Sequence, residues 1–505
     1  MRKFFVLVLG LVFAVQLTAQ NGLEPKQPYL VADFNEKSLE SVLEICQKGG
    51  FEYLLERTPF STYGHYQWNP EFASNEKQVA RMAQKAEEHG VHLGLLVQPD
   101  AISENDAYCS SKFCKQFLRE GHVELFSDLE ADECDIALRY TNVIQGVSSL
   151  NLILIDNELI SYGTIERAGD LLLLHHCTRG AYGTRATSHS AKAEAFKLWD
   201  SPDRFVAPEG ALRDSVRMHL ERQIADSQVA FVLQVGDPGQ DLLDASLRVI
   251  QVERWTSDEG VAKSGCLGWI KLHAANKKQD ATSIDEVEWM MSKAVGFDAY
   301  YGLLIDKKAM KEHGRLDEIM EAVKRWEEFR RNGTLTETQL EELRDPYLDW
   351  HLEQNDDKDF QLYQWNFSRR YRCNFVEADS LLIGAEPWEW KVDQEGGFGL
   401  WLQVDGKEAI KDPMVNTEKG LVMIPCVIKP GERLEYNFGE VAILMDANHK
   451  KIKEISIEGV AMLPEGTSQV HFFCETEREG AKPEVTLRYI TSSKMVRYQL
   501  ENYHK

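Results

Sequence analysis

The feature that most constrains the fold is an alternation of short apolar runs with helical patterns near the start of the chain. The runs 29–34, 51–56 and 91–98 are typical of strands, and helical patterns lie between them at 38–50 and 75–89. A helix that connects two strands brings the second strand parallel to the first. The pattern therefore predicts a parallel sheet with helical crossovers.

The same alternation resumes in the middle of the chain. Further strands are predicted at 229–235, 247–253, 266–273 and 298–305, and helices at 203–226, 283–295, 307–331 and 336–353. These strands bring the total to seven, whereas a (β/α)8 barrel has eight. We interpret residues 21–356 as an α/β fold, an irregular (β/α)8-type barrel. An open doubly wound sheet is the alternative, and the lack of a Gly-x-Gly-x-x-Gly phosphate loop disfavours it.

Two β-rich regions depart from this alternation. Residues 124–199 form short alternating runs with Gly and Asp at the turns, which predicts a small β module inserted into the barrel. Residues 357–505 also lack helical periodicity, and they predict a C-terminal β-sandwich of the jelly-roll type. There Trp388 and Trp390 share one strand face, which we expect to be core rather than a binding platform.

The first residues, the net charge and the lengths of the apolar runs exclude several classes of protein. Residues 1–20 have basic Arg2 and Lys3 before an apolar run and a small-residue exit, which predicts a secretory signal peptide without a lipoprotein cysteine. A net charge of −24 argues against a nucleic-acid partner. No later apolar run reaches the ~20 residues of a membrane span. We expect a secreted or periplasmic protein.

The nine cysteines are too few and too scattered for a disulfide framework. Cys109 and Cys114 could close a small loop, and the others are expected to be mostly buried free thiols. No Cys/His spacing indicates zinc, and we expect no cofactor and no catalytic metal. A structural Ca²⁺ in the sandwich is left open, although no oxygen-ligand motif marks one.

The stretch 150–196 contains "LILIDNELISY" and "CTRGAYGTRATSHSAKAEAF". It resembles a small β module of phage-tail and surface glycan-binding proteins. The resemblance implies a structural insert without catalytic residues. His175, His176, His189 and Arg179 are therefore expected to determine the fold of the module.

The stretch 51–106 contains "GHYQWNPEF", "HGVHLGLLVQPD" and "NDAY". It resembles barrel glycosidases of the α-galactosidase clan and secreted proteins of polysaccharide-degrading Bacteroidetes. The resemblance implies a (β/α)8 fold that acts on glycans at the carboxyl ends of its strands. That clan carries an Asp nucleophile after a middle strand, where this chain has Asp237 behind a Val-Gly spacer.

The strand ends supply candidate catalytic groups for three hypotheses. Hydrolysis of a glycosidic bond needs two carboxyl groups, and the candidates are Glu56, Asp237 and Glu253. The first alternative is a polysaccharide lyase that acts by β-elimination on a uronate, with a His or Tyr base from among His65, Tyr66 and His273. The second alternative is a non-catalytic glycan-binding protein.

Other side chains are predicted to bind the polysaccharide or oligosaccharide. A lyase would need an Arg to neutralise the uronate carboxylate, and flat aromatic rings can stack on sugars. The predicted substrate-binding residues are Arg57, Tyr66, Trp68, Asp100, Arg254 and Trp255. Trp269 lies inside a predicted strand, so core packing is expected for it.

Overall fold

The computed structural model describes residues 27–498, with gaps at 146–148, 202–203, 236–241, 244, 259, 278, 333–334, 356–358, 377–379, 393–394 and 461. The predicted signal peptide lies outside this range. The described chain divides into two compact units. Among the described residues, unit 1 holds 34–40 and 55–235, and unit 2 holds 27–33, 41–54 and the chain from 242 onward.

Six strands form a parallel sheet in the order β13-β3-β2-β1-β15-β14. Their bounds are β1 Tyr29–Ala32, β2 Tyr53–Glu56, β3 His92–Val97, β13 Phe231–Gln234, β14 Cys266–Leu272 and β15 Tyr300–Ile305. From β1 the strands follow the sequence outward through β2 and β3 to β13. On the other side of β1 lies the last strand of the sheet, β15, and β14 lies next to it. In a doubly wound sheet, the order of the strands would instead reverse at the centre of the sheet. The cyclic order is that of a barrel, and within the described residues no ladder joins β13 to β14.

The helices that follow these strands mostly match the prediction. They are α1 Leu39–Gly49, α2 Glu76–Glu88, α3 Gly210–Ser227, α6 Ile284–Phe297, α7 Lys307–Glu312, α8 Leu316–Asn332 and α9 Glu337–Arg344. Asn75 caps α2 by accepting the Gln78 N–H, and Ser283 begins α6 with a capping box. The predicted long helix 307–331 is two helices, because His313 ends α7 in an extended conformation.

One predicted strand of the sheet is wrong. Residues 247–253 lie in α4 (Arg248–Thr256), which α5 (Val261–Ser264) follows. β-branched Val249, Ile250 and Val252 suggested a strand. However, the buried side chains of α4 are Gln251 and Trp255, four residues apart, so tertiary burial selects a helix. The place beside β14 is taken by Leu242, which forms an isolated parallel bridge to Trp269.

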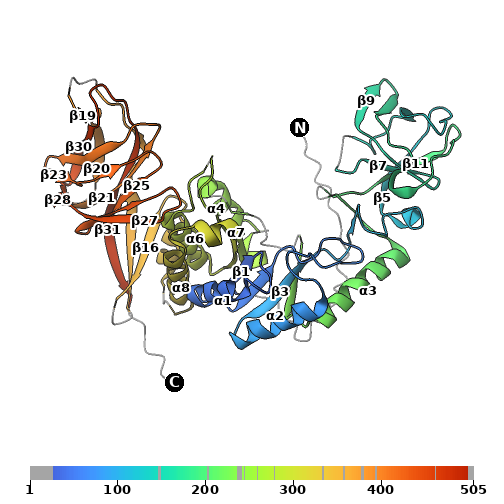
Figure 1. The fold of residues 1–505 in the computed structure, drawn as a ribbon, viewed down its shortest axis with the longest axis horizontal. Helices are drawn as coiled ribbons and strands as arrows, with labels where there is room; N and C mark the ends of the chain where they lie inside the picture. The colour runs from blue at the N-terminus through green and yellow to red at the C-terminus, as the bar shows by residue number, and fades with distance from the viewer. Residues whose placement is uncertain are drawn as a thin grey trace. The chain divides into compact units, whose positions relative to one another are not determined.

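The insert is a separate β module within unit 1, coloured cyan to green in Figure 1. Its strands are β5 Arg119–Glu124, β6 Ile136–Arg139, β7 Leu152–Ile155, β8 Glu158–Ser161, β9 Thr164–Ala168, β10 Leu171–His175 and β11 Glu194–Leu198. They form two small antiparallel sheets around one apolar core. The short strands β4 (Ile102–Ser103) and β12 (Phe205–Val206) pair with each other. Residues 119–198 thus contain seven strands among the described residues.

A network of buried charges lies inside this insert. Glu158 accepts a bidentate pair of hydrogen bonds from Arg179, at 2.7 and 2.9 Å. Nε2 of His189 lies 2.8 Å from the same carboxylate. Burial alone would raise the pKa of Glu158, but these hydrogen bonds lower it to about 2. Arg179 and His189 thus stabilise the fold of this module.

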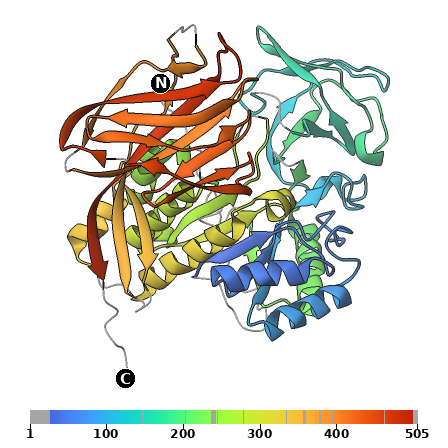
Figure 2. The same cartoon turned by 60° about the vertical axis from the view of Figure 1, so that its left-hand side comes forward.

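The C-terminal region consists of two antiparallel sheets, seen in orange and red in Figures 1 and 2. Its main strands are β16 Asp349–Gln354, β17 Phe360–Phe367, β20 Trp388–Val392, β21 Gly396–Asp405, β22 Ile410–Thr417, β25 Arg433–Tyr436, β26 Val441–Met445, β27 Lys451–Ser456, β30 Gly466–Thr476 and β31 Glu484–Tyr498. Both sheets contribute to one apolar core. Trp388 and Trp390 pack on this core, as predicted.

The β-rich region begins earlier than predicted, because residues 349–353 form strand β16 and not the end of a helix. A buried ion pair joins β16 to α6: Nδ1 of His351 lies 2.7 Å from Glu288. Trp326 of α8 donates to the same carboxylate at 3.2 Å. These partners for Glu288 hold the start of the β region against the helices of unit 2.

We expect this His351–Glu288 pair to make stability fall in alkaline solution. Burial alone would lower the pKa of His351, but Glu288 raises it from 6.5 to about 9. A raised folded-state pKa means that the stabilisation is complete below pH 6.5 and is lost as the pH rises to about 9. The loss is on the order of 3 kcal/mol. Denaturant unfolding between these two pH values should show this slope in the wild type, and an equal slope in His351→Gln would contradict it.

Two smaller expectations are settled by the structure. Cys109 and Cys114 are both buried free thiols, so the predicted small disulfide loop is wrong. Trp269 is buried in β14 and donates its indole N–H to the Tyr29 hydroxyl at 2.7 Å, so it is a core residue. No helix among the described residues is both long enough and apolar enough to cross a bilayer.

Candidate functional site

The loop after β2 is folded around the buried carboxylate of Asp106. This carboxylate accepts the backbone N–H groups of His65 and Tyr108, each at 2.9 Å. Gly64 has φ +114°, and a Cβ there would lie 2.7 Å from Oδ1 of Asp106. Only glycine therefore fits the corner that brings His65 to the carboxylate.

Tyr66 fixes the other side of this corner. It is fully buried, has φ 51°, and donates its hydroxyl to the carbonyl oxygens of Gln98 (2.7 Å) and Pro99 (3.0 Å). Burial raises the pKa of Tyr66, so its hydroxyl stays protonated. Tyr66 was predicted to contact substrate, but the structure places it as an anchor between the loop and the end of β3.

The His65 ring is held in one orientation. Its Nδ1 lies 2.8 Å from Oδ1 of Asp106, whose side chain is 1% exposed, and its ring stacks on Tyr108 with centroids 4.0 Å apart. An ionised carboxylate can only accept, so Nδ1 carries the proton. Nε2 of neutral His65 is then left with a free lone pair, and the side chain is 34% exposed. This is the arrangement of a general base oriented by a carboxylate.

A second histidine completes the cluster. His219 of α3 lies with its ring 4.9 Å from the His65 ring, and its Nε2 is 3.1 Å from the Tyr108 hydroxyl. Burial and the neighbouring His65 lower the pKa of His219. Burial raises the pKa of Tyr108. Both groups are therefore neutral near neutral pH, and we call His65, Asp106, Tyr108 and His219 the His65 cluster.

The neighbouring Asp100 ties the end of β3 to α3. Its carboxylate receives a bidentate pair of hydrogen bonds from Arg217, at 2.8 and 2.7 Å. Arg217 precedes His219 by two residues on the same helix. The ion pair thus positions α3, and with it His219, beside the loop. Asp100 was predicted to bind substrate, and here its carboxylate is engaged by Arg217.

Glu56 ends β2, as predicted, and its side chain is buried. It accepts hydrogen bonds from the N–H of Phe34 at 3.2 Å and the N–H of Thr58 at 3.0 Å. The carboxylate therefore holds together the segments that follow β1 and β2. Arg57 is half-buried beside it, and Trp68 is 9% exposed and packs on Phe60.

The other predicted residues of the barrel face lie elsewhere. Glu253 and Arg254 are exposed on helix α4. Trp255 is buried and donates its indole N–H to the carbonyl oxygen of Leu267 at 2.9 Å, so it packs in the core. Asp237 lies outside the described residues. Of the predicted carboxylates, Glu56 thus ends a strand in unit 1, and Glu253 lies on a helix of unit 2.

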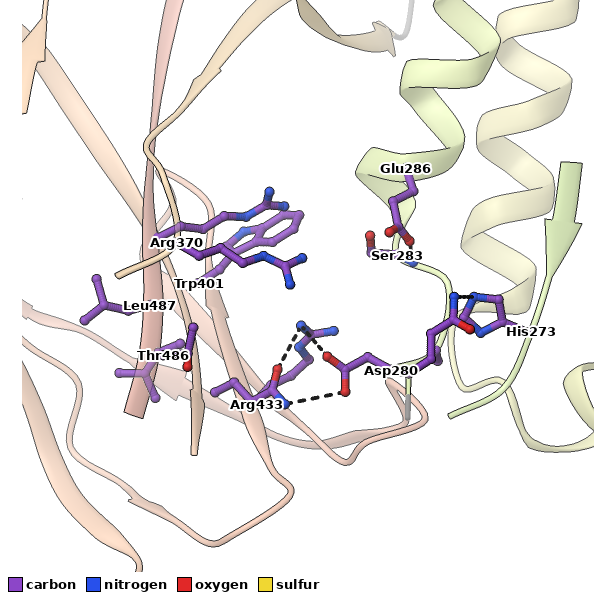
Figure 3. A pocket seen from close by; sticks show the side chains of 14 residues that line it. His273, Asp280, Ser283, Glu286, Arg370, Trp401, Arg433, Thr486 and Leu487 are labelled. Carbon is purple, nitrogen blue, oxygen red and sulfur yellow. Dashed lines mark hydrogen bonds and ion pairs between the residues drawn. The ribbon is translucent and has the colours of Figure 1, made fainter. Parts of the chain in front are cut away.

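His273 lines a pocket of about 260 Å³ in unit 2. The pocket is bounded by the loop after β14, the start of α6 and strands of the C-terminal region, as Figure 3 shows. Nε2 of His273 lies 2.8 Å from the Gln279 amide nitrogen. Of the ten predicted site residues that the structure describes, His273 is the one that lines this pocket.

Sequence reasoning did not select three members of the His65 cluster. Asp106 and Tyr108 belong to "NDAY", a motif that carried the resemblance to glycan-degrading proteins and could have pointed to them. His219 lies in the middle of a helix, where no local signal marks it. Among the described residues, no group of three or more His, Cys, Asp or Glu side chains is arranged to hold a metal ion.

Fold and site together define an α/β protein with acid–base groups where its parallel strands end. No protein-family model matches the chain, and no curated protein matches it.

Three solved structures resemble the chain at low identity. The isomalto-dextranase of Arthrobacter globiformis T6 is 10% identical with TM-score 0.28, covering 92% of this chain and 96% of that one. A GH36 α-galactosidase of Geobacillus stearothermophilus is 11% identical with TM-score 0.32, covering 90% and 55%. The α-amylase of Geobacillus thermoleovorans is 7% identical with TM-score 0.31, covering 90% and 99%. At TM-scores this low, the likenesses do not define the activity of this chain.

Proposed function

We propose that the protein is an enzyme that cleaves glycosidic bonds, with His65 as its proton-transfer group. The observation that carries the proposal is the contact of 2.8 Å between His65 Nδ1 and the buried Asp106 carboxylate. It leaves Nε2 as the basic atom on a side chain that solvent and substrate can reach. The glycan as substrate follows from the resemblance of residues 51–106 to barrel glycosidases. The signal-like residues 1–20 support action outside the cytoplasm.

The leading reaction is hydrolysis. Nε2 of His65 takes a proton from the water that attacks the anomeric carbon, while Asp106 stabilises the imidazolium that forms. The glycosidic C–O bond breaks, and its oxygen takes a proton from a second acid. The Tyr108 hydroxyl, which lies 3.1 Å from Nε2 of His219, can supply that proton, and the tyrosinate then recovers a proton from the His65 imidazolium. The hydroxyl group of the water is thereby added to the anomeric carbon, and a proton is added to the leaving oxygen.

Elimination is the second candidate, and the Tyr108–His219 contact favours it. Both groups are neutral, so the Tyr108 hydroxyl carries a proton that it can give to the oxygen of the leaving sugar. In this reaction His65 removes the proton beside a uronate carboxylate. The electron pair forms a C=C bond, and the C–O bond to the leaving sugar breaks. No water is consumed, and the new chain end is an unsaturated uronate.

A polysaccharide panel tests the proposal and separates the two reactions. The protein lacking residues 1–20 is incubated with neutral and uronate-containing polysaccharides. New reducing ends without ultraviolet absorbance of a conjugated uronate would show hydrolysis, and reducing ends with that absorbance would show elimination. Retention of a glycan without any product would contradict the proposal and leave a binding protein.

A further inference from the structure

The pocket in unit 2 contains polar groups that are only loosely bonded to one another. Nη2 of Arg433 lies 4.0 Å from Oδ2 of Asp280 and 3.5 Å from Oε1 of Gln403. The Gln403 amide nitrogen lies 3.5 Å from Oδ1 of Asp280. These distances exceed the usual 2.7–3.2 Å of N–H···O bonds. Figure 3 shows Asp280 and Arg433 facing each other in the pocket.

The Arg433 charge is not neutralised from its other side. There the guanidinium contacts Nε2 of His449. Burial, and next the Arg433 charge, lower the pKa of His449 to about 2, so this imidazole is neutral. Among the described residues, the carboxylate of Asp280 is thus the negative group within 4.0 Å of Arg433, and an oxygen atom lying beside the pair could bond to both.

Arg370 brings a further set of donors to the pocket. It is exposed, and among the described residues its guanidinium forms no hydrogen bond or ion pair. Figure 3 shows it beside Trp401, across the pocket from Ser283 and Glu286. The third arginine, Arg488, is fixed differently: it pairs with Asp285 at 2.5 Å and stacks over Trp401 at 4.3 Å. Arg370 is therefore available to a ligand.

The balance of charges indicates the class of ligand. Three arginines face three carboxylates, those of Asp280, Asp285 and Glu286, so an anion would meet repulsion as well as attraction. A guanidinium can only donate and a carboxylate can only accept. A hydroxyl group does both, so it can accept from Arg433 while it donates to Asp280. A neutral compound with several adjacent hydroxyl groups satisfies this mixed lining best.

We infer that this pocket binds a neutral sugar residue, as a second glycan site apart from the His65 cluster. Its volume of about 260 Å³ is at the small end of ligand pockets and fits a group about the size of one sugar ring. Asp280, Gln403 and Arg433 hold the hydroxyl groups, and Arg370 reaches the ligand from the opposite side. The inference rests on the proposed function for the presence of glycans, and on the pocket for the place and the chemistry.

Titration calorimetry tests the inference with the methyl glycosides of glucose, galactose and mannose as probes. Glucuronate and sulfate serve as anionic probes. The protein carries His65→Ala, so that cleavage of glycosidic bonds is slow during the titration. We expect at least one neutral glycoside to bind, and Asp280→Asn and Arg370→Ala each to weaken it about tenfold, which is ~1.4 kcal/mol. Arg372→Ala, an exposed arginine paired with Glu484, is the control and should bind as before.

Each alternative outcome has a defined meaning. Binding of glucuronate or sulfate without any neutral glycoside would overturn the inference in favour of an anion site. Equal affinity in Asp280→Asn, Arg370→Ala and Arg372→Ala would place the sugar elsewhere and also overturn it. Sugar binding at the pocket in a protein that cleaves no polysaccharide would contradict only the proposed function. Cleavage by a protein whose pocket binds no sugar would contradict only this inference.

Discussion

Replacing His65 by alanine is expected to lower the rate of glycan cleavage by about 10²–10⁴-fold, the usual contribution of a positioned general base. The substitution removes the imidazole whose Nε2 accepts the proton. Its effect on folding should be small, because the side chain is 34% exposed. Reducing ends released per minute from the polysaccharide that the wild type cleaves give the rate.

A matched control exists in the same unit. His92 is 33% exposed and its Nδ1 lies 2.8 Å from Glu87, so it resembles His65 in its exposure and in having a carboxylate partner. Unlike His65, it begins strand β3 and does not lie in a loop that follows a strand. His92→Ala should keep the wild-type rate. If His65→Ala and His92→Ala were equally active, His65 would not be the proton-transfer group. Asp106→Asn should also slow the reaction, because an amide does not hold the imidazolium as a carboxylate does.

Replacing Glu158 by alanine is expected to unfold the β insert locally, at a cost of about 3–5 kcal/mol. The substitution leaves Arg179 and His189 buried without their shared carboxylate. Both side chains are almost fully buried, at 6% and 0% exposure, so water cannot replace the lost partner. Limited proteolysis with mass spectrometry should show cleavage within 119–198 that the wild type resists.

The control for this substitution is Glu166→Ala in the same insert. Glu166 is 67% exposed and its carboxylate lies 3.5 Å from His175, so its loss should cost ~0–1 kcal/mol. Comparable resistance to proteolysis in Glu158→Ala and Glu166→Ala would show that the buried network does not stabilise the insert. Activity at the His65 cluster then separates a local effect from unfolding of all of unit 1.

Much of the fold could be predicted because its strands are buried on both faces. Continuous apolar runs such as 29–34 and 91–98 are unambiguous when helical patterns flank them. The prediction of a strand at residues 247–253 was wrong for the opposite reason. Their β-branched side chains favour a strand locally, but the contact of the Trp255 indole with Leu267 needs a helix, and that contact is not visible in the sequence.

The site was predictable in part. The loop of His65 was selected because a Gly-His-Tyr corner follows a buried strand. The partner Asp106 lies 41 residues further along the chain and His219 is on α3, so their meeting depends on the crossover connections. The carboxylate of Glu56 accepts hydrogen bonds from two backbone N–H groups, and the chemical type of a strand-end residue alone does not reveal such contacts.

The role of His65 as the proton-transfer group is tested by adding imidazole to His65→Ala. The rate of glycan cleavage is measured at rising imidazole concentrations. Free imidazole can occupy the space left beside Asp106 and Tyr108 and accept the proton in place of the missing side chain. We predict a low rate without imidazole and a saturable increase as it is added, with no increase in His92→Ala. A wild-type rate in His65→Ala before any imidazole is present would contradict the account.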